Sequence, residues 1–435
     1  MEPQPLGRVV GLCQDDPQFL ADAAVIAEFK KAMGLNLILL IGGDVRLGDE
    51  AIAKLPSDDP SQRRGPGVAW ADDDNSFRET IGRYRAMGLQ IWRIWGGWHG
   101  WSSDPKLSAR DVFDRPIGEL AGSAHAMEDH RTTVCPCNPR TNAWLEAAYS
   151  DLAARYPLDG ISLTHARFQI GAHVRGLFCC ACAHCEGRAQ SYGIDFAALR
   201  RDLQELGRIV EGPSRDTPPL PILLGAGPAP EDERYRRLRY AFRVFMDFRC
   251  RAIAENLERI RLAVHAGAAR PFSFASDWHM PTTAPWVGHD FSRLGPISDM
   301  AMPLILHTSY FLVQTFAAWA DHMVERWPGM TEADALQACY RAMGYQDLAL
   351  PLQIEELGAD EPGREAKTTP LGTIVTRELA KARQMTSRST VSYPVLHADK
   401  LGHREAHRQF RRAFELGHDG VIFMGSRELL GETAR

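Results

Sequence analysis

The sequence predicts an α/β protein, a (β/α)8 TIM barrel with long loop insertions. Eight short apolar runs alternate with segments whose apolar residues recur at helical spacing, the pattern of parallel strands joined by helices. Polar or charged residues follow most of these runs, as they do at the carboxyl ends of barrel strands, where active sites are built. The 435 residues are enough for a barrel of about 250 residues with insertions.

The first half of the chain supplies four of the predicted strands. The run at 35–44 is apolar almost throughout, which suits a parallel strand covered on both faces. The run that begins at 159 alternates apolar and small polar residues before Thr164, His165 and Arg167. The predicted strands are 7–13, 35–44, 89–95 and 159–164, and the predicted helices are 16–33, 75–87 and 142–156.

The second half continues the same alternation. Its predicted strands are 270–277, 299–307, 391–397 and 420–425, and its predicted helices are 192–210, 233–266, 311–326 and 332–343. The segment 211–232 is rich in proline and glycine, which is typical of a linker or loop. We expect one domain over residues 1–435, with insertions near 51–67, 102–134, 169–190 and 211–232.

Composition excludes several classes of protein. A net charge of −5 and a pI near 6.3 give no basic surface of the kind that binds nucleic acid. No apolar run reaches the length of about 18 residues that a membrane span needs, and the amino terminus lacks a signal-peptide pattern. A cytoplasmic location is therefore expected. Neither a phosphate-binding loop nor a dinucleotide-binding glycine motif is present.

Cysteines are concentrated in one region: six of the nine lie between Cys135 and Cys185. Cys180, Cys182 and Cys185 form a C-x-C-x-x-C spacing, and Cys135 can supply a fourth thiolate. Four thiolates close a tetrahedral site, so we expect structural Zn²⁺ fastening a long loop beside the fourth strand. Cys137 and Cys179 are lower-ranked substitutes. The alternative is a set of reduced buried thiols, or disulfides if the protein is exported.

The segment from Tyr156 to Leu163, Tyr-Pro-Leu-Asp-Gly-Ile-Ser-Leu, followed by this cysteine cluster, resembles glycoside hydrolase-like barrels. The cysteine motif is similar to that of the zinc-containing family-42 β-galactosidases, in which a Cys-Pro-x-x-Pro cysteine joins a later Cys-x-Cys-x-x-Cys. The resemblance implies a (β/α)8 barrel, a carbohydrate or glycoside as partner, and often a homo-oligomer. It also implies zinc bound by four residues, Cys135, Cys180, Cys182 and Cys185. Segments near 286–291, 297–303 and 417–423 resemble those of uncharacterised glycosidase-like barrels.

The chain departs from the family-42 pattern at the position of the catalytic acid/base. The family-42 enzymes carry an Asn-Glu pair at the end of the fourth strand. This chain has Thr164-His165 there, and no Asp or Glu follows until Glu186. The resemblance therefore supports the fold and the zinc site more than it supports retaining hydrolysis.

Candidate site residues follow from the predicted strand ends. Asp277 ranks first because Ser-Asp-Trp-His follows a clean apolar strand, and Asp44 ranks second after Gly42-Gly43. For each, the alternative role is to cap the next helix. His165 can bond a sugar hydroxyl or replace the missing acid, and Arg167 can bind an acidic sugar or pair with a carboxylate. The catalytic candidates are Asp277, Asp44, His165 and Asp399, and the substrate-binding candidates are Arg93, Trp95, His99, Arg167, His279 and His307.

Three functions fit these residues. The first is a glycoside hydrolase-like enzyme that uses two carboxyl groups at the barrel mouth, where Glu355 or Glu356 could also enter from a loop. The second is a sugar isomerase or lyase in which the strand-end His and Asp residues hold a catalytic divalent metal, a reading we favour less. The third is a non-catalytic carbohydrate-binding barrel, which the missing acid motivates.

Overall fold

The computed structural model describes most of the chain. The described residues are 9–14, 22–41, 45–56, 74–99, 107–117, 133–169, 174–212, 220–225, 231–308, 311–357, 369–425 and 429. Asp44 lies outside them, and for His307 and Asp399 only the backbone is described.

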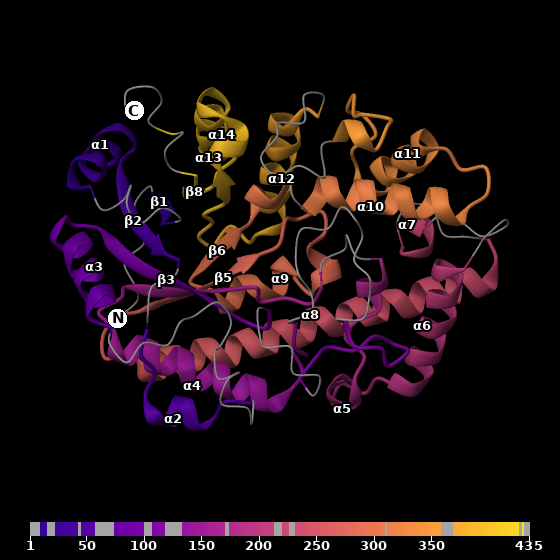
Figure 1. Cartoon of the computed structure of the whole chain (residues 1–435), viewed down its shortest axis with the longest axis horizontal. Coiled ribbons are helices and arrows are strands. Elements are labelled where there is room, and N and C mark those ends of the chain that lie inside the picture. The colour runs from indigo at the N-terminus through magenta and orange to yellow at the C-terminus, as the bar shows by residue number, and fades with distance from the viewer. Residues whose placement is uncertain are drawn as a thin grey trace.

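Eight parallel strands form a nearly closed barrel with helices between them (Figure 1). Their spatial order is β6-β5-β4-β3-β2-β1-β8-β7, so β1 pairs with both β2 and β8 and the two ends of the chain meet in adjacent strands. Isolated parallel bridges, Ala301 with Ser392 and Leu304 with Val395, join the remaining edges. The strands are β1 Val9–Gln14, β2 Leu35–Leu40, β3 Gln90–Gly96, β4 Gly160–Thr164, β5 Ser273–Trp278, β6 Met300–Pro303, β7 Val395–His397 and β8 Gly420–Met424.

The helices begin and end at recognisable caps. Asn138, Asp195 and Asp232 each accept a hydrogen bond from a backbone N–H in the first turn of α4, α6 and α8, which satisfies an otherwise unpaired donor. Gly344 ends α11 in the left-handed conformation that glycine adopts without strain. The main helices are α1 Ala23–Met33, α2 Asp49–Ala53, α3 Asn75–Ala86, α4 Pro139–Arg155, α5 Ala183–Ser191, α6 Phe196–Glu211, α7 Leu220–Leu223, α8 Glu233–Gly267, α9 Phe291–Leu294, α10 Phe311–Arg326, α11 Glu332–Met343, α12 Leu371–Met385, α13 Ala398–Leu401 and α14 His403–Glu415.

Side chains alternate between the inside of the barrel and the layer under the helices. On β3, Trp92 and Ile94 join the interior cluster, whereas Ile91 and Trp95 pack outward. A Cβ at Gly160 would clash with the indole of Trp92, so glycine on β4 makes room for this large interior ring. The register of these strands thereby decides which residues can reach the barrel mouth.

The sequence-based prediction of a barrel is confirmed, and each predicted strand has its counterpart. The strand expected at 299–307 ends at Pro303, and the one expected at 391–397 begins at Val395. The segment 211–232, expected to be irregular, contains the short helix α7. Helices α12 and α14 were not predicted.

Helices α4 and α8 pack side by side along one flank of the barrel (Figure 1). The long helix α8 runs beneath β5 and on towards α6, so it contacts both the barrel wall and the cysteine-bearing region. Among the described helices none is long and apolar enough to cross a membrane.

Candidate active site and thiol cluster

Asp277 is the buried carboxyl group at the carboxyl end of β5. Its side chain is 8% exposed, and its Oδ2 atom accepts hydrogen bonds from the Thr164 hydroxyl and, at 3.3 Å, from the His165 backbone N–H. Its Oδ1 atom has no hydrogen-bond partner among the described residues. One oxygen is therefore anchored to β4 and the other is available to a ligand.

The surroundings of Asp277 favour its protonated form. Burial raises the pKa of the Asp277 carboxyl above its ordinary value. The charge of His165, the hydroxyl of Thr164 and the charge of Arg167 offset only part of that rise. A carboxyl group tuned in this direction is suited to donate a proton near neutral pH.

His165 leaves β4 in a left-handed conformation, with φ of 55°, which is uncommon for a residue other than glycine. The turn aims its N–H at Asp277. Gly97 at the end of β3 allows β4 to approach closely, because a Cβ there would lie 2.7 Å from Leu163 Cδ2. The Gly97 N–H donates to the Thr164 carbonyl at 2.7 Å, which fixes the two strand ends together.

His99 and His165 stack face to face beside the carboxyl group. Their ring centroids are 5.1 Å apart at an interplanar angle of 26°. His99 Nδ1 and the Thr133 hydroxyl are hydrogen-bonded at 2.7 Å. Thr133 is a site residue that sequence reasoning missed, since it lies in an irregular segment that no periodic pattern marks.

His289, also missed, joins the loops that follow β4 and β5. Its Nδ1 accepts the His279 N–H at 2.7 Å, and its Nε2 bonds the Ala166 carbonyl at 2.8 Å. Burial lowers the pKa of His289 to about 4, so the ring is neutral and its Nε2–H donates. This neutral clamp holds Ala166, the neighbour of His165 and Arg167, in place.

Five of the predicted site residues meet in this region: Asp277, His165, His99, Arg167 and His279. Arg167 is 4% exposed and near enough for its charge to act on Asp277. His279 is also buried, directly after β5.

Two predicted substrate contacts, Arg93 and Trp95, need correction. Arg93 is 1% exposed, with its guanidinium 5.2 Å from the ring centroid of Phe77 on α3. Trp95 packs against Trp144 and Tyr149 of α4, at 5.5 and 5.3 Å between centroids. The alternation along β3 sends Trp92 and Ile94 inward, so these two side chains point to the helical layer instead of the mouth.

Four thiols form a compact group. The sulfur atoms of Cys135, Cys180, Cys182 and Cys185 all lie within 4.8 Å of one another. Those of Cys135 and Cys185 are 3.5 Å apart, and those of Cys135 and Cys182 are 3.4 Å apart. A tetrahedral site with metal–sulfur bonds of about 2.3 Å has sulfur–sulfur edges of about 3.8 Å, so the group can hold one metal ion after small shifts of the sulfur atoms. Among the described residues this is the one such cluster of possible ligands.

Backbone and amide groups support the thiols. The Arg110 N–H donates to Cys180 Sγ at 3.4 Å, and the Cys137 N–H donates to Cys135 Sγ at 3.3 Å, contacts of the type that orient thiolate ligands. The amides of Asn142 and Asn256 both donate to the Pro136 carbonyl, at 2.9 and 2.6 Å. The cysteine turn is therefore held by both α4 and α8.

The thiol cluster is joined to the Asp277 region by a short segment of chain. The Val134 N–H donates to the Trp98 carbonyl at 3.0 Å, next to the pairing of Thr133 with His99. Cys135 follows immediately. A metal ion bound to Cys135 would therefore hold the segment that positions His99.

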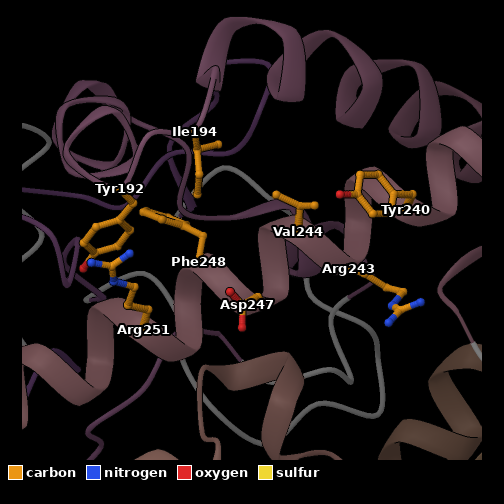
Figure 2. Close-up of a pocket in the computed structure, with 8 residues that line it drawn as sticks. All are labelled: Tyr192, Ile194, Tyr240, Arg243, Val244, Asp247, Phe248 and Arg251. Carbon is orange, nitrogen blue, oxygen red and sulfur yellow. The ribbon is translucent and has the colours of Figure 1, made fainter.

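A separate pocket of about 410 Å³ opens on the outer helical layer (Figure 2). Arg251 lies over the ring of Tyr192 at one end, and Tyr240 and Arg243 lie at the other. None of the predicted site residues lines this pocket. Its lining residues are Tyr192, Ile194, Tyr240, Arg243, Val244, Asp247, Phe248 and Arg251.

Comparisons with known proteins give likeness in fold. No protein-family model and no curated protein sequence matches the chain. The glycoside hydrolase domain of PgaB (BpsB) from Bordetella bronchiseptica is similar in structure, with a TM-score of 0.52 and 12% identity over 99% of this chain and 97% of that one. The catalytic domain of β-amylase from Paenibacillus polymyxa has a TM-score of 0.42 and 10% identity over 96% and 91%. At such identities the first likeness shows a shared fold, and the second carries no further argument.

Proposed function

We propose that the protein is a glycoside hydrolase-like enzyme in which Asp277 donates a proton to the leaving oxygen of a glycosidic bond. The observation that carries the proposal is the state of this carboxyl group. It is buried, its pKa is raised, one oxygen is anchored and the other has no partner among the described residues. The fold shared with the PgaB glycoside hydrolase domain supports the same reading.

Hydrolysis needs a second carboxyl group, as nucleophile or as base for water. In this proposal it comes from Asp399, in the short helix α13 that directly follows β7, or from Asp44, which comes four residues after β2 in the sequence. Its distance from Asp277 would decide the stereochemistry, with about 5–5.5 Å for retention and about 6.5–9.5 Å for inversion.

The remaining groups bind the sugar. His165 is half-buried beside Asp277 and can bond a hydroxyl. His99 supports it by stacking, and Arg167 supplies a positive charge that would favour a polar or acidic sugar.

The four thiols are proposed to hold structural Zn²⁺, the ion that favours four thiolates in tetrahedral geometry. The site is closed and buried, so it would fix the loop and would not activate water. The likeness of the cysteine motif to that of family-42 enzymes supports this assignment.

The decisive experiment compares wild type with Asp277→Asn on a panel of aryl glycosides and oligosaccharides. Loss of the acid should lower kcat by about 10²- to 10⁴-fold. The control is Asp347→Asn, an exposed carboxylate paired with Arg377, which should keep full activity. Unchanged turnover in Asp277→Asn would refute the role of Asp277. If neither protein shows turnover and both bind the same sugar equally, a non-catalytic binding barrel is favoured.

The same variant has a predicted effect on stability. The folded-state pKa of Asp277 lies above the unfolded value, so the folded protein binds more protons between the two values. The contribution of Asp277 to stability is therefore present at low pH and lost as pH rises through the folded pKa. Asp277→Asn should melt at a higher temperature than wild type at pH 7, with the difference shrinking in acid, as calorimetry at several pH values would measure.

A further inference from the structure

Arg249, on α8, is a fully buried cation without a carboxylate partner. It is 0% exposed, and its Nη1 atom donates to the Leu177 carbonyl at 3.1 Å and contacts the Met246 sulfur at 3.8 Å. Its guanidinium lies over the ring of Phe168 at 4.6 Å and near that of Phe245 at 5.6 Å. No described carboxylate contacts it, and its Nε and Nη2 atoms have no hydrogen-bond partner.

A charge buried in this way costs several kcal/mol unless an opposite charge lies nearby. Burial lowers the pKa of Arg249 to about 10, which still leaves it charged at neutral pH, and the groups that oppose this shift are all thiols. The largest of these contributions come from Cys179 and Cys250, and the next two come from Cys185 and Cys180, which belong to the four-thiol cluster. Among the described residues, the acidic groups that act on Arg249 are therefore thiols.

The positive charge of Arg249 is opposite in sign to the charge expected of a metal–tetrathiolate centre. Four thiolates and one divalent ion carry a net charge of −2, and a buried anion of that size needs a cation close to it. Arg249 also bonds the carbonyl of Leu177, in the short helix Arg175–Phe178 that leads directly into Cys179 and Cys180. Arg249 thus fixes the segment that leads to a ligand, and its charge is available to that ligand's cluster.

We propose that Arg249 is the counter-charge of a divalent metal–tetrathiolate centre formed by Cys135, Cys180, Cys182 and Cys185. It acts as a positioning residue because it touches neither the metal nor a substrate. The inference concerns metal binding alone, so its outcome does not depend on whether the protein cleaves glycosides.

The experiment measures zinc affinity by competition with a chromophoric chelator in wild type, Arg249→Met and Arg249→Lys. Met keeps an unbranched side chain that can fill part of the buried space and removes the charge, whereas Lys keeps the charge. Met should weaken zinc binding by about 10- to 100-fold, the range found when groups that support metal ligands are lost. Lys should retain most of the affinity. The matched control is Arg251→Met, an exposed arginine on the same helix that pairs with Glu255, which should leave zinc binding unchanged.

Three results would overturn the proposal. Zinc affinity in Arg249→Met equal to that of wild type would show that the charge is not needed. Equal weakening in the Lys and Met variants would assign the effect to packing or to the Leu177 hydrogen bond. Wild-type protein that binds no zinc would remove the centre itself. If Arg249→Met does not fold, Arg249→Lys decides, because a large loss of zinc affinity in that variant contradicts a role for charge.

Discussion

Thr164 and Asp277 face each other from adjacent strands, β4 and β5, and a hydrogen bond joins the hydroxyl to the carboxylate. This bond stabilises the ionised form of Asp277 and so lowers the pKa of its carboxyl group. The neighbouring hydroxyl of Ser162, two residues earlier on the same strand, is buried and has no hydrogen-bond partner in the part of the chain that the structure describes. The two hydroxyls offer a matched comparison.

Thr164→Val should move the pH–activity profile. Without the hydroxyl the pKa of Asp277 rises further, so the alkaline limb of kcat/KM, where the acid loses its proton, shifts to higher pH. A hydrogen bond to a charged group is worth about 1.5–3 kcal/mol, which corresponds to a shift of about one to two pH units. Ser162→Ala should leave the limb where it is. A Thr164→Val profile that coincides with wild type would argue against Asp277 as the acid.

The sequence predicted Asp277 because a polar residue after a clean apolar strand marks a strand end. It misplaced Arg93 and Trp95 because the face each residue takes depends on register. Only the contact of Trp92 with Gly160, a residue 68 positions away, shows which face of β3 points inward. The roles of Thr133 and His289 depend likewise on contacts that no local spacing encodes.

Among the elements, α12 owes its position to a buried carboxylate. Glu378 is 0% exposed and accepts hydrogen bonds from the Thr282 N–H at 3.0 Å and from the Tyr345 hydroxyl. The Nζ atom of Lys381, one turn further along α12, lies 3.1 Å from Glu378 Oε1. The helix is thereby tied to the loop after β5 and to the segment after α11.

Glu378→Ala should destabilise the protein by about 3 kcal/mol. Three donors, the N–H and the hydroxyl of Thr282 and the hydroxyl of Tyr345, lose their acceptor, and the partly buried Lys381 loses its counter-charge. Urea unfolding followed by circular dichroism measures the change. The control is Glu415→Ala, an exposed residue paired with Arg412, for which less than about 0.5 kcal/mol is expected. A similarly small effect at Glu378 would mean that apolar packing alone holds α12.

The buried Glu378 also explains why α12 escaped prediction. The buried face of α12 contains Glu378 among Ile374, Val375 and Leu379, which interrupts the apolar pattern. On α14 the buried Ala406 and Ala413 and the partly buried Phe410 and Phe414 do recur at helical spacing, so this helix could have been predicted from its apolar pattern. The strands, in contrast, were visible because parallel barrel strands are apolar on both faces.

For the molecule as a whole, the thiol cluster links distant parts of the chain. Cys135 precedes α4, and the other three cysteines lie some 45 or more residues later, around α5. A metal ion bound there would stabilise the folded state by about 4 kcal/mol when present at about a thousand times its Kd.

Removal of bound metal with a chelator should therefore lower the melting temperature, and added Zn²⁺ should restore it. Cys185→Ser should melt lower than wild type and show no response to either treatment. Cys339→Ala, which removes a buried thiol on α11 outside the cluster, should still bind one zinc per chain. Differential scanning fluorimetry measures the melting temperatures, and metal analysis measures the zinc content of each variant. A wild-type melting temperature indifferent to chelator and to zinc would count against a structural metal.

Two isolated bridges close the barrel between β6 and β7, Ala301 with Ser392 and Leu304 with Val395. At the first bridge the Ala301 N–H donates to the Val391 carbonyl and the Tyr393 N–H donates to the Ala301 carbonyl, both at 2.8 Å. Every other pair of neighbouring strands is joined by at least three paired residues. The contact between β6 and β7 is thus the weakest strand pairing of the barrel. The chain that connects these two strands contains α10, α11 and α12. Because this long connection must fold back before β6 and β7 can meet, we expect their contact to form last during folding. We also expect the barrel to open first between β6 and β7 on heating.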